Sequence, residues 1–344
     1  VITMKFRRIA IVFLVMMLPF LGMSQQLMTV QHAIDTALLN NFDIRIAKNE
    51  VDMARMNNTY GMAGGLPYVT ANAGENASVT TINQDKSDGT SSNITNQGQN
   101  SLSAGVTAGI TLFNGFRIVA TKERLNRLQD LSELQLNQQI QGTIADIMVT
   151  YYDIIRQQNY LKIIQNSLDV SKQKLDIINV KKNVGMADAV EILQAQTDVN
   201  SAEQLLELQK MAVEQNKSDL LLLISSKAGK PFSVTDTIVV DQSLQLDSIL
   251  RYLERNPQYL SAEQQILIDQ QLVKEVSAQR YPSVKLNAGY DFYQANLNKG
   301  TTSMNQNFGP TAGISLQVPI FNGNIYKTQK DIAKIREDNS KLET

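Results

Sequence analysis

The chain has 344 residues, of which 32 are basic and 33 acidic, and 43% of the residues are apolar. The balanced charge argues against a nucleic-acid partner, and the apolar content is sufficient to bury a core. Cysteine is absent, which excludes disulfides, thiol catalysis and a lipidated N-terminal cysteine.

Residues 1–24 are typical of a secretory signal peptide. Basic residues precede an apolar run from Ile9 to Leu21, and small residues at Gly22 and Ser24 suit a cleavage site. The alternative is an N-terminal membrane anchor, but the run is short compared with the ~20 residues of a spanning helix. We therefore expect the protein to leave the cytoplasm and to lose residues 1–24.

Four segments alternate between apolar residues and small or polar residues. They form two pairs, 67–80 with 101–112 and 283–293 with 311–320, and Glu75 is an exception on the apolar side of the first segment. Their length and period of two are typical of tilted outer-membrane strands, although one-sided strands of a soluble sheet would give a similar pattern. The polar stretches 81–100 and 294–309 between the paired segments predict hairpin loops.

Residues 117–225 predict a helical hairpin, since they contain no proline and only two glycines, Gly142 and Gly185. A positive φ at Gly185 would end one helix and Asp188 would cap the next, so the two helices would be antiparallel and joined by a tight tip. Apolar residues of the first helix recur at intervals of three, four or seven, which predicts side-by-side packing. They are Ile140, Ile144, Ile147, Tyr151, Ile154, Leu161, Ile164, Leu168, Leu175 and Ile178.

The chain contains an internal repeat, because residues 41–74 align without gaps on 256–289. The first repeat, 25–226, is expected to contain a helix, a strand pair and the helical hairpin. Residues 227–250 would form an equatorial connector, and 251–344 would form a second repeat with a helix, a strand pair and the start of another helix. We expect this second repeat to be truncated at its C-terminal end; a family member with a naturally short second arm is the alternative.

Four membrane strands cannot close a barrel, and an open sheet edge is not tolerated in lipid. The chain must therefore oligomerise, with two copies giving eight strands and three copies giving twelve. The long helices carry polar residues all round, so we expect them to extend into an aqueous compartment. A ring of such helices, continuous with the barrel lumen, would form a duct.

The order and repetition of these motifs resemble the TolC-type outer membrane efflux protein family, over about residues 27–344. The motifs are Leu66-Pro67 and Tyr281-Pro282 before strands, Phe113-Asn114-Gly115 and Phe321-Asn322-Gly323 after strands, and the stretch Val184–Gln196 at the tip. The resemblance implies a mainly α fold with membrane β: long antiparallel hairpins forming an α-barrel, and four strands per protomer in a 12-stranded β-barrel of a homotrimer. The implied function is the outer membrane channel-tunnel of a tripartite efflux or type I secretion system, a passive exit duct for small molecules or proteins.

The resemblance also implies partners and site residues. The barrel would lie in outer membrane lipid, the helices in the periplasm, and the tip would dock a periplasmic adaptor protein that works with an inner-membrane pump. The tip residues are Val184, Gly185, Asp188 and Glu191, and the strand-to-helix turns are Phe113, Asn114, Gly115, Phe321, Asn322 and Gly323. Asp146 and Asp153, one heptad apart, could form an acidic ring in the lumen or could lie on a solvated helix face.

No motif suggests catalysis. The single histidine, His32, is expected on a helix surface, and the sequence contains neither a glycine-rich phosphate loop nor metal-ligand spacing. We therefore expect no enzymatic activity, no cofactor and no bound metal, so that energy for transport would come from a partner. The alternative function is a soluble periplasmic coiled-coil adaptor or scaffold without a barrel, which would explain the helices but not the four matched strands.

Overall fold

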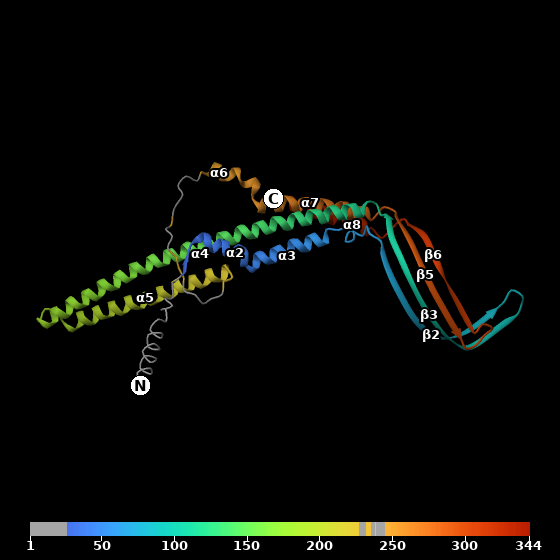
Figure 1. Ribbon diagram of the computed structural model, residues 1–344, viewed down its shortest axis with the longest axis horizontal. Helices are drawn as coiled ribbons and strands as arrows, with labels where there is room; N and C mark the ends of the chain where they lie inside the picture. Colours follow the sequence, from blue (N-terminus) through green and yellow to red (C-terminus); the bar gives the residue numbers. More distant parts are fainter. Residues whose placement is uncertain (1–25, 227–231, 235–237, 239–244) are drawn as a thin grey trace, which may run out of the picture. The chain divides into compact units, whose positions relative to one another are not determined.

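The computed structural model describes residues 26–226, 232–234, 238 and 245–344 (Figure 1). The predicted signal peptide and much of the predicted connector lie outside these residues. In chain order the elements are β1 (Gln26–Met28), α2 (Val30–Asn40), α3 (Phe42–Asn57), β2 (Tyr68–Asp85), β3 (Ser91–Phe113), α4 (Arg117–Asn183), α5 (Ala189–Leu223), β4 (Phe232–Val234), α6 (Leu246–Arg251), the 3-10 helix η1 (Leu253–Arg255), α7 (Pro257–Ala278), β5 (Ser283–Leu297), β6 (Met304–Gln317) and α8 (Ile325–Glu343).

The chain divides into two compact units, which we describe separately. The first contains Ile140–Ser243 together with the described residues up to Arg45, and the second contains Ile46–Gln139 and Leu244–Thr344. Helices α3 and α4 contribute residues to both units. The sequence repeats therefore mark a duplication of elements, whereas the second compact unit combines parts of both repeats and the first takes its repeat residues from the first repeat alone.

In the first unit, α4 and α5 form the predicted antiparallel hairpin. The apolar stripe of α4 faces its partner: Ile164 and Leu168 are buried together with Val199 and Leu206 of α5. None of the ten predicted stripe positions is exposed, five being buried and five half-buried. The heptad-like spacing thus correctly identified the packed face of the helix.

A second apolar cluster of the first unit surrounds Tyr151. The strands β1 and β4 pair in parallel and contribute Met28 and Phe232 to this cluster. The Tyr151 side chain is fully buried, and its hydroxyl donates to the Met28 carbonyl oxygen at 2.9 Å. Burial of an aromatic ring with a satisfied hydroxyl fixes β1 against α4.

The repeated asparagines Asn41 and Asn256 begin equivalent helices. The Oδ1 atom of Asn41 accepts from the Ile44 backbone N–H at 3.0 Å at the start of α3. The Oδ1 atom of Asn256 accepts from the Gln258 backbone N–H at 2.8 Å at the start of α7. Each side chain satisfies a backbone donor that the helix itself leaves free, which explains why asparagine recurs at this place in both repeats.

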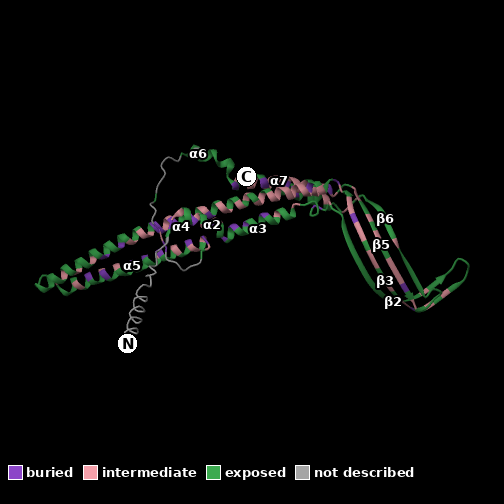
Figure 2. Cartoon of the chain, in the orientation of Figure 1, coloured by how far each residue is buried: buried purple, intermediate pink, exposed green. Residues whose placement is uncertain are grey.

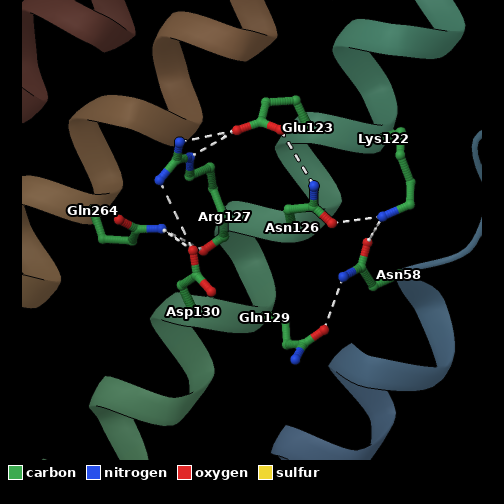
Figure 3. Close-up of polar contacts among 8 residues, drawn as sticks. All are labelled: Asn58, Lys122, Glu123, Asn126, Arg127, Gln129, Asp130 and Gln264. Atoms are coloured by element: carbon green, nitrogen blue, oxygen red, sulfur yellow. Dashed lines mark hydrogen bonds and ion pairs between the residues drawn. The ribbon is translucent and has the colours of Figure 1, made fainter.

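In the second unit, polar side chains connect the helices (Figure 3). The Lys122 ammonium of α4 donates to Asn58, which follows α3, and the Asn58 amide donates to Gln129 at 2.8 Å. On α7, Gln264 donates to the Asp130 carboxylate and to the Arg127 carbonyl oxygen, each at 3.1 Å. Both apolar clusters found among the described residues belong to the first unit. Hydrogen bonds therefore help to join the helices of the second unit, alongside buried apolar side chains such as Val51 and Ile268.

The strands of the second unit form one antiparallel sheet in the order β2-β3-β5-β6 (Figure 1). The two predicted strand pairs are confirmed, but their ends differ from the prediction. Only residues 86–90 and 298–303 remain between the paired strands, so the predicted loops 81–100 and 294–309 are too long. At the other end, β6 stops at Gln317 instead of continuing to 320, because Pro319 has no N–H to pair.

Candidate functional site: an amphipathic sheet and a hairpin tip

The sheet has one apolar face and one polar face. Side chains of directly paired residues lie on the same face, so the register extends the alternation of each strand across the sheet. In the middle row, Ala108 pairs with Val69 and with Ala288, and Ala288 pairs with Ala312. The apolar face contains Val69, Ala71, Ala73, Leu102, Ala104, Val106, Ala108, Ile110, Val284, Leu286, Ala288, Tyr290, Phe292, Phe308, Pro310, Ala312, Ile314 and Leu316.

Both faces and both edges of this sheet are open in the single chain. Figure 2 shows that the outer strands β2 and β6 are exposed along nearly their whole length. On the apolar face, the Val69, Ile314 and Leu316 side chains are 68%, 71% and 65% exposed. Within the described chain, β2 and β6 each pair on one side only. Such a sheet requires an apolar environment on one face and further strands at its edges.

The apolar face ends at a defined row. On β5 it extends from Val284 to Phe292, which is about 27 Å along the strand and about 20 Å in height at a tilt of ~40°. The next row consists of Glu75, Leu102, Gln294 and Gln306 and is mostly polar. Glu75, the exception in the sequence pattern, therefore lies where the apolar band ends. Its carboxylate accepts from the Asn100 side-chain amide at 2.7 Å.

The two Phe-Asn-Gly turns have the same backbone conformation. Gly115 has φ 69° and the next residue, Phe116, has φ 65°; Gly323 has φ 66° and Asn324 has φ 65°. Their environments differ. A Cβ atom on Gly115 would lie 2.6 Å from the Tyr281 Cβ and 2.7 Å from the Ala278 carbonyl oxygen, whereas a Cβ on Gly323 would meet nothing within 4 Å. The glycine of the first turn is thus required both for its conformation and for space.

This difference predicts unequal effects of the same substitution. Gly115→Ala should destabilise the protein by roughly 2–4 kcal/mol, because a positive φ and a steric clash both add to the cost. Gly323→Ala should cost only about 1–2 kcal/mol, since only the positive φ opposes it. Urea unfolding of the detergent-solubilised variants measures both. The asparagine variants provide a control, because asparagine tolerates positive φ: Gly323→Asn should be close to neutral and Gly115→Asn should remain destabilised. Equal losses for the two alanine variants would contradict this interpretation.

The hairpin tip is closed by backbone hydrogen bonds around Gly185. Its φ is 73°, its N–H donates to the Lys182 carbonyl oxygen at 2.9 Å, and the Met186 N–H donates to the Lys181 carbonyl oxygen at 2.8 Å. This pair of bonds is the Schellman arrangement that ends a helix at a glycine. Asp188 then caps α5 by accepting from the Glu191 N–H at 2.8 Å. The predicted roles of Gly185 and Asp188 in closing the tip are confirmed.

The tip presents apolar side chains to solvent. Val184, Met186 and Val190 are 66%, 75% and 71% exposed, and Asp188 and Glu191 are also exposed. Behind them, two ion pairs connect the helices: Lys172 with Glu203 and Lys174 with Asp198, each at 3.0 Å. The hydrogen bond from Lys174 lowers the pKa of Asp198 below its ordinary value. The tip is therefore a partly apolar surface on a hairpin whose two helices are held together by ion pairs.

The two candidate lumen acids have different surroundings. Asp146 is exposed. Asp153 pairs with Arg156 at 2.6 Å and accepts from the Asn216 side-chain amide of α5 at 2.8 Å. A paired and hydrogen-bonded carboxylate presents less net charge to a passing solute, so Asp146 is the better candidate of the two.

Two features were not anticipated from the sequence. Phe116 adopts a positive φ although phenylalanine has no preference for it; the only signal was its position after a repeated Phe-Asn-Gly. Arg124 of α4 pairs with Glu275 of α7 at 2.6 Å, and both side chains are largely shielded from solvent. No local pattern predicts that contact, because the two residues lie far apart in the chain.

Metal sites and spanning helices were searched for among the described residues only. In that part of the chain, no group of histidine, aspartate and glutamate side chains is arranged to hold a metal ion. No described helix combines the length and the apolar character needed to cross a membrane.

Comparison with known proteins places these features in a family. The solvent efflux pump outer membrane protein SrpC of Pseudomonas putida is 27% identical over 316 residues, covering 89% of this chain and 64% of SrpC. The pyoverdine export outer membrane protein OpmQ of Pseudomonas aeruginosa is 24% identical, covering 88% of this chain and 63% of OpmQ. The chain thus spans just under two thirds of the length of these relatives.

Solved structures share the fold. The Campylobacter jejuni CmeC outer membrane channel superposes with a TM-score of 0.73 at 19% identity, covering 91% of this chain and 66% of CmeC. CusC superposes with a TM-score of 0.66 at 20% identity, covering 91% of this chain and 71% of CusC. The family model for outer membrane efflux proteins matches residues 33–225, which is more than half of the chain. The chain therefore belongs to the outer membrane efflux protein family.

Proposed function

We propose that this protein forms the outer membrane channel-tunnel of a tripartite efflux or type I secretion system. The observation that carries the proposal is the four-stranded sheet, with one apolar face, one polar face and two open edges. Three copies would join edge to edge into a 12-stranded barrel whose apolar face meets lipid and whose polar face lines a lumen. A soluble adaptor has no use for an exposed apolar face of this height.

The long polar helices would extend the lumen into the periplasm. Each strand pair passes into a helix through a Phe-Asn-Gly turn with matching positive φ values, so the strands and the helices that follow them would form one continuous wall in the channel. Residues 1–24 would direct export and be removed. The duct itself would be passive, because an open lumen lined by small polar side chains contains nothing that could store energy.

The partners follow from the proposed position in the cell envelope. The tip residues Val184, Gly185, Asp188 and Glu191 would dock a periplasmic adaptor, which connects the duct to an inner-membrane pump. The exposed apolar side chains of the tip support this role, because apolar patches on a polar helix mark interaction sites. Asp146 would face the lumen of the helical part. Family membership supports a role in efflux, and the names of the relatives SrpC and OpmQ refer to solvents and to pyoverdine as the molecules that those proteins handle.

The oligomeric state of the gene product tests the proposal. Native mass spectrometry of detergent-extracted outer membranes should find a trimer that depends on detergent. A monomer or dimer in the soluble periplasmic fraction would overturn the proposal and favour an adaptor or scaffold without a barrel.

A further inference from the structure

The polar face of the sheet carries a single acidic side chain at the height of the apolar band. From Tyr68 to Asn72 on β2 and from Gly105 to Thr111 on β3, this face presents only tyrosine, threonine, asparagine and glycine. On β5 it presents Asp291 and, towards the helices, Lys285. On β6 it presents glycine, threonine, serine and glutamine. At this height, the charge on the proposed wall of the barrel lumen is therefore concentrated at two residues.

The position of Asp291 is built by its neighbours. In the register, Asp291 pairs with Gly105 on β3 and with Gly309 on β6, so glycines flank it on both sides. A Cβ atom on Gly105 would lie 2.6 Å from the Asp291 Oδ1, which places the carboxylate directly over that glycine. The other oxygen, Oδ2, accepts from the Thr311 hydroxyl at 3.1 Å. The side chain thus lies across three strands, is held in place, and remains exposed.

Lys285 does not neutralise this charge. The two residues are six positions apart on one strand, which is about 20 Å at ~3.3 Å per residue. That separation exceeds the Debye length of ~8 Å at physiological ionic strength, so each charge acts on its own part of the wall.

We propose that Asp291, flanked by Gly105 and Gly309 and fixed by Thr311, makes the barrel lumen selective for cations. This inference rests on the proposed trimeric channel, in which three copies place three carboxylates in one ring. The solutes favoured by such a ring are positively charged ions and organic cations. The effect is modest because the charges lie on the wall of a wide, water-filled lumen: about a twofold preference at ~0.15 M salt, increasing at ~0.01 M salt, where the Debye length is ~30 Å.

Reversal potentials of the purified oligomer in planar bilayers under a potassium chloride gradient test this inference. Asp291→Asn keeps the shape of the side chain and should lower the cation-to-anion permeability ratio about twofold. Glu75→Gln is the matched control, because it removes the same charge close to the same height on the apolar face; its ratio should equal that of the wild type. Asn287→Asp, which adds a carboxylate between Gly109 and Gly313 on the polar face, should raise the ratio.

The possible outcomes separate the inference from the proposed function. An unchanged ratio for Asp291→Asn, in channels that conduct like the wild type, would overturn the role of Asp291 and leave the channel intact. Equal shifts in the permeability ratio for Asp291→Asn and Glu75→Gln would also overturn it, because a carboxylate on the apolar face would then matter as much as one on the polar face. If Asp291→Asn does not assemble, Asn287→Asp decides alone, and a ratio that does not rise refutes the inference. A wild-type protein without conductance would instead refute the proposed function.

Discussion

Ala288→Arg is expected to prevent assembly in the outer membrane. Ala288 lies in the middle row of the apolar face, between Ala108 and Ala312. An arginine on the lipid face at mid-height costs about 2–4 kcal/mol per copy, and a trimer would incur this cost three times. We expect the heat-sensitive oligomer band in gel electrophoresis to disappear and the protein to be lost from the outer membrane fraction.

The neighbouring position provides the control. Asn287→Arg introduces the same side chain one residue away, on the polar face, where Gly109 and Gly313 leave space beside it. This variant should assemble like the wild type. If Ala288→Arg assembled equally well, the apolar face would not meet lipid, and the barrel interpretation would be wrong.

Gly185→Val should remove most of the transport while leaving the oligomer intact. Valine is strongly disfavoured at the φ of 73° that closes the tip, at a cost of about 1–2 kcal/mol. That cost lowers the equilibrium ratio of intact to open tips by roughly 5- to 30-fold. The sheet that would hold the copies together is distant in sequence and should be unaffected. Export of a fluorescent dye by cells and native mass spectrometry of the extracted protein measure the two properties.

The loss of transport in Gly185→Val can be attributed to backbone conformation and not to a steric clash. A Cβ atom on Gly185 would meet nothing within 4 Å, so only the backbone conformation opposes substitution. Gly185→Asn should therefore retain transport, because asparagine accepts a positive φ. Normal transport by the valine variant would show that the tip conformation is not needed for docking.

The sequence predicted best those features that depend on local chemistry. The ends of α4 and α5 follow from Gly185 and Asp188, which act through bonds to residues a few positions away. The packed face of α4 follows from spacing alone. The amphipathic sheet was also predictable, because the strand register places the apolar side of every strand on the same face of the sheet.

Features that depend on distant parts of the chain were not predictable. Residues 91–100 contain asparagine, serine and glutamine and resemble a loop, yet they pair with β2 and with β5, as Gln99 does with Leu297. Ladder hydrogen bonds outweigh the weak turn preference of such residues. The parallel pairing of β1 with β4 joins segments more than 200 residues apart, and no local pattern predicts it. The position of Glu75 at the end of the apolar band likewise depends on Gln294 and Gln306, which lie more than 200 residues away in the chain.

The unequal strand lengths have a consequence for the outer rim of the proposed duct. Beyond the Glu75 row, β2 continues for ten residues to Asp85, whereas β5 continues for only three, from Ala295 to Leu297. Around a closed ring of three copies, tall and short hairpins would alternate. The rim would then have three high segments, the β2–β3 hairpins, alternating with three low segments, the β5–β6 hairpins. Large molecules that approach from outside the cell would meet the high hairpins first. Small solutes that leave through the duct could exit sideways above the low hairpins.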